Sequence, residues 1–477
     1  MNLNDQLTGI LNDLQGVWVE STLILGAILI LILGLIKENN WVLKGCFLVV
    51  ILLAFYLNLS SNLDGFILEE SLQLTRLSRS FTAIFILVAF LLLIFNRSSR
   101  HLSEFYFFIL AMLVGSTFMM KANSLLIIYL SIELASLASY VLTNFTFKKR
   151  GFEAGIKYLL FGAISSAVML FGLGLIYGTT GTFFISEWGT QTFDSLLSQV
   201  GFIFLLFGIF FKISLAPSHI WVPATYQAAP PDATAFMSIV PKLAGLVLLM
   251  RIFDTNSFSE NHWVIQLVMV LGMITLIIGT LGALLQQNAR RMISFGAIAH
   301  SGFLLPFALM GNDFTQEAFW YYAVVYAIMN LAAFYLLDIY ERQEVNTVSD
   351  YANTNKSVWL GASFTLILIS LIGIPPVAGF TAKFFLFTNL WENYQLAENS
   401  IYLWYLIVAV LATVGSLFFY LQIPKQIFLS QPEDLKSFNF KNSTKILATL
   451  FCIVLLLLFF VPQLVMEAQQ LVNNVHE

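Results

Sequence analysis

Apolar stretches of about 20 residues recur along almost the whole chain, and they limit the fold more than any other feature. A helix needs about 20 residues to cross the roughly 30 Å hydrocarbon core of a bilayer. Because 58% of the residues are hydrophobic and only 10% are charged, a water-soluble fold could not bury the apolar surface. Within lipid, isolated spans must be helical to satisfy their own backbone groups. The sequence therefore predicts an all-α integral membrane protein.

The apolar segments predict about fourteen transmembrane helices without a linker that would divide the chain, so 1–477 is predicted to be a single membrane domain. The predicted spans lie near 19–36, 41–57, 81–95, 102–119, 124–145, 154–177, 201–217, 233–252, 263–285, 292–310, 318–337, 358–388, 401–423 and 446–465.

The distribution of Lys and Arg predicts the orientation, because short cytoplasmic loops are enriched in basic residues. If the first helix runs inward, fifteen of the 23 basic residues fall on the cytoplasmic side: Lys37, Lys44, Arg97, Arg100, Lys148, Lys149, Arg150, Arg290, Arg291, Arg342, Lys356, Lys425, Lys436, Lys441 and Lys445. Only four fall on the opposite side: Arg76, Arg79, Lys121 and Arg251. We therefore expect both termini on the outer side. The first 20 residues contain no Lys or Arg, so the first apolar segment is expected to be a retained helix and not a cleaved signal.

Ionisable residues within the predicted spans are candidates for function. A charge at the bilayer centre costs about 2.5–3.5 kcal/mol, so Glu133, Lys212, Lys242 and Lys383 are interpreted as parts of an ion path. Lys157 allows a second interpretation. It lies within a turn of the predicted cytoplasmic end, four residues after Glu153, and could simply extend to the interface.

Proline and glycine interrupt the same helices. Pro217 follows Lys212 by five residues, and Pro241 directly precedes Lys242 and frees the carbonyl of Met237 as a polar neighbour for the ammonium. The segment 373–376 (Gly-Ile-Pro-Pro) breaks the run that leads to Lys383. Broken helices near the membrane centre indicate ion sites in transporters built from inverted repeats.

The two strongest breaks are five helices apart, which predicts two inverted five-helix repeats, helices 4–8 and 9–13, with broken helices 7 and 12. The corresponding regions are 1–101 for helices 1–3, 102–252 for repeat one, 263–427 for repeat two, and 443–477 for helix 14 and the tail.

Two histidines extend the candidate list. His219 lies seven residues after Lys212, two helical turns, although Pro217 weakens this shared face and an interfacial position is the alternative. His300 lies within predicted helix 10, where a structural histidine satisfied by a carbonyl is the alternative.

Cofactor chemistry finds no support in the sequence. The two cysteines, Cys46 and Cys452, form no CxxC motif, and the five histidines lack metal-ligand spacing, so redox chemistry is expected elsewhere. The net charge of −4 is spread between apolar runs and argues against a nucleic-acid surface.

Several longer strings together resemble subunit N of bacterial complex I, a proton-pumping NADH:quinone oxidoreductase, and its mitochondrially encoded equivalent, subunit 2, within the antiporter-like family. These strings are residues 123–145 (NSLLIIYLSIELASLASYVLTNF), 153–182 (EAGIKYLLFGAISSAVMLFGLGLIYGTTGT), 211–251 (FKISLAPSHIWVPATYQAAPPDATAFMSIVPKLAGLVLLMR), 290–304 (RRMISFGAIAHSGFL) and 373–387 (GIPPVAGFTAKFFLF). Residues 231–233 (Pro-Asp-Ala) depart from the expected Thr-Pro-Val type of loop, which affects loop detail only.

The resemblance implies roles for four residues. Glu133 on helix 5 would pair with Lys212 on broken helix 7, Lys242 would link inward, and Lys383 would serve the exit side. The chain would then be a non-redox subunit of a translocase (EC 7.1.1.-), moving protons along a mid-membrane row of Glu, Lys and His side chains, driven by quinone reduction in partner subunits.

The resemblance also implies surroundings for the chain. It would hold no cofactor itself, and NAD, FMN, iron-sulfur clusters and quinone would be bound by partner subunits. Expected partners are the antiporter-like subunit M, small subunits such as K and J, and the lipid bilayer. The expected location is the cell inner (plasma) membrane, with both termini periplasmic.

Related families remain as alternatives. Subunit M resembles this chain but has a glutamate in place of Lys383, and subunit L has a long lateral helix, whereas this chain ends twelve residues after Val465. An Mrp-type cation/proton antiporter subunit is the main alternative. An independent metabolite carrier would fit the broken helices but not the strings.

Overall fold

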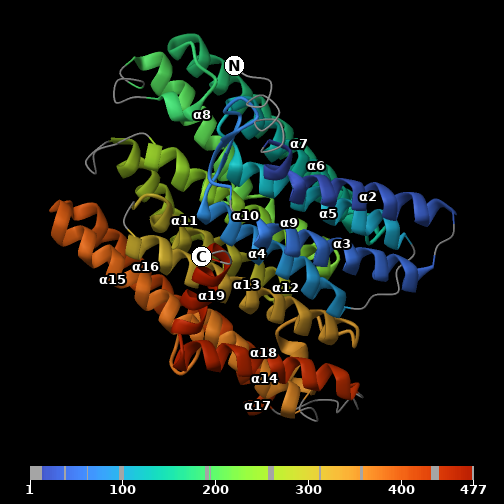
Figure 1. Cartoon of the computed structure of the whole chain (residues 1–477). Coiled ribbons are helices and arrows are strands. Elements are labelled where there is room, and N and C mark those ends of the chain that lie inside the picture. The colour runs from blue at the N-terminus through green and yellow to red at the C-terminus, as the bar shows by residue number, and fades with distance from the viewer. Residues whose placement is uncertain are drawn as a thin grey trace. The chain divides into compact units, whose positions relative to one another are not determined.

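The computed structural model describes residues 13–36, 39–61, 63–95, 101–188, 193, 195–255, 263–310, 313–354, 358–430 and 440–474. Helices dominate these residues (Figure 1). Twelve of the described helices are long and apolar enough to cross a membrane. The only sheet in the described ranges is an antiparallel pair, β1 (Gly65–Ile67) and β2 (Leu72–Leu74). The predicted all-α membrane fold class is confirmed.

The chain forms two compact units, and each is described by itself. Unit 1 comprises Met1–Ile213, Val240–Ser257 and Ala468–Glu477, and unit 2 comprises Ser214–Ile239 and Phe258–Glu467. The helices of unit 1 are α2 (Trp18–Ile36), α3 (Asn40–Ser60), α4 (Arg76–Leu91), η1 (Leu92–Phe95), α5 (Leu102–Lys121), α6 (Leu125–Thr143), α7 (Lys149–Thr180), η2 (Ile185–Glu187) and α8 (Leu196–Ile213).

The helices of unit 2 are α9 (Val222–Ala228), α11 (Trp263–Leu284), α12 (Ala289–Leu304), η3 (Leu305–Ala308), α13 (Asp313–Glu341), η4 (Ser349–Thr354), α14 (Val358–Ile372), α15 (Ala378–Ala397), α16 (Ser400–Tyr420), α17 (Gln422–Leu429) and α18 (Asn442–Phe460). Helices α10 (Pro231–Thr255) and α19 (Gln463–Asn474) contribute residues to both units.

Each predicted span coincides with helical structure. Two of them fall outside the group of twelve long apolar helices: α12, which has 16 residues, and the broken pair α14 and α15. The predicted span 201–217 ends early, at Ile213, because the chain leaves helical geometry at Ser214, where φ is +64°. Five residues of the charge analysis lie outside the described residues: Lys37, Arg97, Arg100, Lys356 and Lys436.

Local sequence signals account for several helix starts. The Asn39 side chain accepts a hydrogen bond from the Trp41 backbone at the start of α3. Thr75 and Ser78 form a reciprocal capping box at the start of α4. Such caps satisfy backbone N–H groups that have no partner within the helix.

Glycines bring the helices that carry the site into backbone contact. A Cβ on Gly115 of α5 would lie 2.7 Å from the Ala135 backbone nitrogen of α6. Gly172 of α7 and Gly201 of α8 face each other, and a Cβ on either would lie within 3 Å of the other's carbonyl oxygen. Small residues permit this close packing in membrane helices, where hydrophobic association between helices is weak. The packing fixes α5–α8 around the first group of candidate residues.

Candidate functional site

Lys212 lies at the end of α8, where its side chain is buried. It is 2% exposed, and its Nζ donates a hydrogen bond to Ser136 Oγ of α6 at 3.1 Å. The helix stops one residue later, at Ile213. The end of the helix places the ammonium beside non-helical backbone. Its surroundings are otherwise apolar, and a charge there is costly unless it has polar partners.

Glu133 lies on α6, three residues before Ser136 and on the same helical face. It is half-buried, and its carboxylate acts electrostatically on both Lys212 and Tyr140. The two described side chains of the expected Glu133–Lys212 pair form no direct ion pair, since the Lys212 contact is to Ser136. Ser136, which also interacts with the Tyr140 hydroxyl, was missed by the sequence analysis, although its spacing from Glu133 could have indicated it.

Lys242 follows Pro241 inside α10 and is 2% exposed. The carbonyl of Met237, which the proline leaves without its helical donor, accepts a hydrogen bond from the Tyr226 hydroxyl at 3.3 Å, and its expected role beside the Lys242 ammonium stays a prediction. Proline lacks the N–H that would bond to this carbonyl, and the tyrosine takes its place. The kink at Pro241 is therefore satisfied by a neighbouring side chain.

Lys383 lies in the first part of α15, next to the break that follows α14. Its Nζ donates to the carbonyl oxygen of Ile372, the last residue of α14, at 2.7 Å. Helix C-termini carry partial negative charge and unsatisfied carbonyls, so this position stabilises an ammonium. Gly373 turns the chain with φ +85°, and a Cβ there would lie 2.8 Å from Lys383 Cδ. The predicted break is therefore present, and its carbonyl oxygen and its glycine position the Lys383 side chain.

His300 on α12 is 2% exposed and belongs to the surroundings of Lys383. Its Nδ1 lies 3.2 Å from the Tyr322 hydroxyl, a polar partner that the sequence analysis did not name. The Phe303 ring contacts both His300 and Lys383. Its ring centroid is 5.8 Å from the His300 ring and 4.2 Å from Lys383 Nζ. A cation over an aromatic face is attracted by the ring quadrupole.

The remaining two candidates are less buried. His219 lies between α8 and α9, is half-buried, and has a buried Nδ1 without a hydrogen-bond partner. Burial lowers the pKa of His219. Lys157 is exposed and forms an ion pair with Glu153 at 2.6 Å, which favours the interfacial interpretation for it. The roles of both residues stay predictions.

A buried ion pair at the predicted outer end of unit 1 was also missed. Lys121 Nζ donates to Glu20 Oε1 at 2.7 Å, and the two side chains are 4% and 0% exposed. Nearby, Arg251 donates to the carbonyl oxygens of Met120 and Ala122. The sequence analysis assigned Lys121 to the outer edge. The position of Glu20 near the start of the first apolar helix was the available signal.

Residues 122–416 match the family model described as "NADH:quinone oxidoreductase/Mrp antiporter, TM". NADH-quinone oxidoreductase subunit N from Chlorobium chlorochromatii is 33% identical over 77% of this chain and 75% of its own length. The chain belongs to the subunit N family. Subunit N 2 from Rhizobium meliloti is 36% identical over 69% of each chain. The resemblance found in the sequence is thereby confirmed.

Solved structures agree with this family. A chain of respiratory complex I from Thermus thermophilus matches with a TM-score of 0.80 and 26% identity, covering 94% of this chain and 99% of that one. The Mrp complex from Dietzia sp. matches with a TM-score of 0.76 at 18% identity, which shows the shared fold alone. In the described part of the present chain, no group of three or more His, Cys, Asp or Glu side chains could hold a metal ion.

Proposed function

We propose that this chain translocates protons as the subunit N component of the membrane arm of an NADH:quinone oxidoreductase. The observation that carries the proposal is the burial of Lys212, Lys242 and Lys383, each 2% exposed, inside or beside broken or kinked helices of a membrane chain. Ionisable groups are rarely kept at such positions unless they line an ion path. Membership in the subunit N family supports the same function.

The proposed mechanism is a cycle of loading and release at each lysine. An incoming proton converts the amine to an ammonium, which burial disfavours and a nearby carboxylate or carbonyl dipole favours. At Lys212 the ammonium is favoured by its hydrogen bond to Ser136 and by the electrostatic attraction of the Glu133 carboxylate. Moving or neutralising this carboxylate would therefore release the proton.

The other lysines would act in sequence. At Lys383 the favourable group is the Ile372 carbonyl, and a change in the break between α14 and α15 would move it. Lys242 would pass the proton inward, and Lys383 would serve the exit side. His300 and His219 would relay protons, with Lys157 as an accessory group at the interface.

The redox steps belong to partner subunits in this proposal. The relatives are named as subunits of NADH-quinone oxidoreductases, and this chain would be a non-redox subunit of the translocase, holding no cofactor. NAD, FMN, iron-sulfur clusters and quinone would be bound elsewhere in the complex. Subunits M, K and J would be its neighbours in the inner membrane, with both termini periplasmic.

The alternative, an Mrp-type antiporter subunit, has weaker support. Several curated relatives with at least 33% identity are named as subunit N, whereas the likeness to the Mrp complex rests on the fold at 18% identity.

The experiment compares Lys383→Met with Lys157→Met in the assembled complex reconstituted into vesicles. Lys383→Met removes the buried ammonium while keeping side-chain volume, and we expect proton pumping to fall strongly with NADH:ferricyanide activity unchanged. Lys157→Met removes an exposed charge and is the matched control, with near-normal pumping. Equal pumping by the two variants, in complexes assembled to the same level, would contradict the proposed role of burial.

A further inference from the structure

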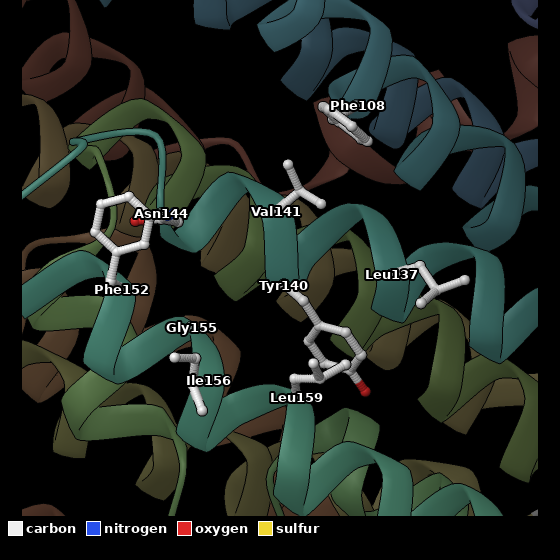
Figure 2. Close-up of a pocket in the computed structure, with 9 residues that line it drawn as sticks. All are labelled: Phe108, Leu137, Tyr140, Val141, Asn144, Phe152, Gly155, Ile156 and Leu159. Carbon is white, nitrogen blue, oxygen red and sulfur yellow. The ribbon is translucent and has the colours of Figure 1, made fainter.

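A pocket of about 360 Å³ lies among α5, α6 and α7 in unit 1 (Figure 2). Its wall is almost entirely apolar, and its main lining residues are Phe108, Leu137, Tyr140, Asn144, Phe152 and Leu159. Gly155 also lines the pocket, and a Cβ there would make only ordinary contacts, with the Tyr140 carbonyl oxygen at 3.6 Å and Asn144 Cβ at 3.7 Å, so this position has room for a larger side chain. In a membrane chain, an apolar hollow of this kind suits an apolar ligand group.

Positive charges cluster at one end of the pocket. Lys148, Lys149 and Arg150 are exposed at the start of α7. They are flanked in the chain by Asn144 and Phe152, which both line the pocket. The nearest acidic residue in the chain is Glu153, which pairs with Lys157 and also acts electrostatically on Lys149 and Arg150, so a single carboxylate faces four basic residues of this segment.

Two polar side chains lie in the turn between α6 and α7, just before the basic residues. Asn144 Oδ1 and Thr146 Oγ1 are buried atoms without a hydrogen-bond partner in the structure. The apolar pocket and the exposed basic residues are therefore adjacent in the chain, and the basic residues lie at the predicted cytoplasmic headgroup level.

We propose that this pocket binds an anionic phospholipid, with one acyl chain inside and the phosphate headgroup on Lys148, Lys149 and Arg150. Basic clusters beside grooves between membrane helices on the cytoplasmic side attract anionic headgroups. A helix from another protein, about 10–12 Å across, is too wide to enter a hollow of about 360 Å³, and an apolar helix would bring no negative charge to the basic residues.

The pocket adjoins the Lys212 group through Tyr140. The ring of this residue forms part of the pocket wall, while its hydroxyl interacts with Ser136, the hydrogen-bond partner of Lys212. A bound acyl chain would keep water away from this side of Tyr140. The binding proposal itself does not depend on the proposed proton path.

The test uses the purified complex and phosphatidylglycerol or phosphatidylcholine probes that carry the same photoreactive acyl chain. We expect the peptide that contains α6 and α7 to be labelled by the phosphatidylglycerol probe in preference to the phosphatidylcholine probe. Gly155→Leu should abolish this labelling by filling the pocket. The triple variant Lys148→Gln, Lys149→Gln, Arg150→Gln should weaken binding of the anionic probe by about tenfold to about 100-fold.

Gly174→Leu is the matched control, since this α7 glycine faces open space outside the pocket and should label normally. Equal labelling by the two lipids, or labelling that survives Gly155→Leu, would overturn the proposal. It would also be overturned if a photoreactive residue at Ile156, which lines the pocket, were to cross-link to a neighbouring subunit and not to lipid. Thermal stability of each variant complex separates loss of lipid from loss of folding.

Discussion

Replacing Ser136 with alanine tests which group holds the Lys212 ammonium. Among the described residues, the Ser136 hydroxyl is the one hydrogen-bond acceptor of Lys212 Nζ, at 3.1 Å. A hydrogen bond to a charged group contributes about 1.5–3 kcal/mol, which corresponds to roughly 10-fold to 150-fold in an equilibrium constant. If pumping follows the population of charged Lys212, Ser136→Ala should reduce the pumping rate by a factor in this range.

The Glu133 carboxylate should stabilise the Lys212 ammonium by a free energy of similar size. Two unit charges at 4 Å interact by about 4 kcal/mol at an effective dielectric constant of 20. This value is an upper limit here, because the Glu133 carboxylate oxygens lie more than 4.0 Å from Lys212 Nζ. We therefore expect Glu133→Gln and Lys212→Met to show a coupling of about 0.5–3 kcal/mol, with the double variant losing little more pumping than Lys212→Met alone.

The assay measures proton pumping and NADH:quinone activity in assembled complexes, with Ser131→Ala as the control. Ser131 is also buried on α6, but it donates to the Ile128 carbonyl of its own helix. If Ser136→Ala pumps as well as Ser131→Ala, the hydrogen bond to Lys212 has no role in loading. Strictly additive losses for Glu133→Gln and Lys212→Met would refute the coupling.

Three further predictions address stability, topology and the relay. Glu20→Gln should leave Lys121 buried without its partner and destabilise the protein by about 3–5 kcal/mol, while the double change Glu20→Leu with Lys121→Met should restore most of the thermal stability, as measured in detergent. A single cysteine at Lys149 should react with an impermeant reagent only from the cytoplasmic face, and labelling from outside intact cells would reverse the predicted topology. Tyr322→Phe removes the hydroxyl next to His300 Nδ1 and should slow pumping to the same extent as His300→Phe, whereas a normal rate would limit the histidine to packing.

The sequence was sufficient for features that depend on position along a single helix. Hydrophobic length predicted the spans, because a helix must cover the bilayer by itself. Depth within those spans singled out Lys212, Lys242 and Lys383, and all three side chains are buried. Proline and glycine predicted the break before Lys383, because its geometry follows from local backbone chemistry.

Tertiary structure alone decided which partner each buried charge meets. Ser136 and not Glu133 contacts Lys212 across 76 positions of sequence, and Glu20 meets Lys121 across 101 positions. Hydrophobic helices show little amphipathic pattern, so the sequence does not specify which face of one helix packs against which neighbour. That choice is made by close contacts such as the approach of Gly115 to Ala135, which depend on the shapes of two helices together.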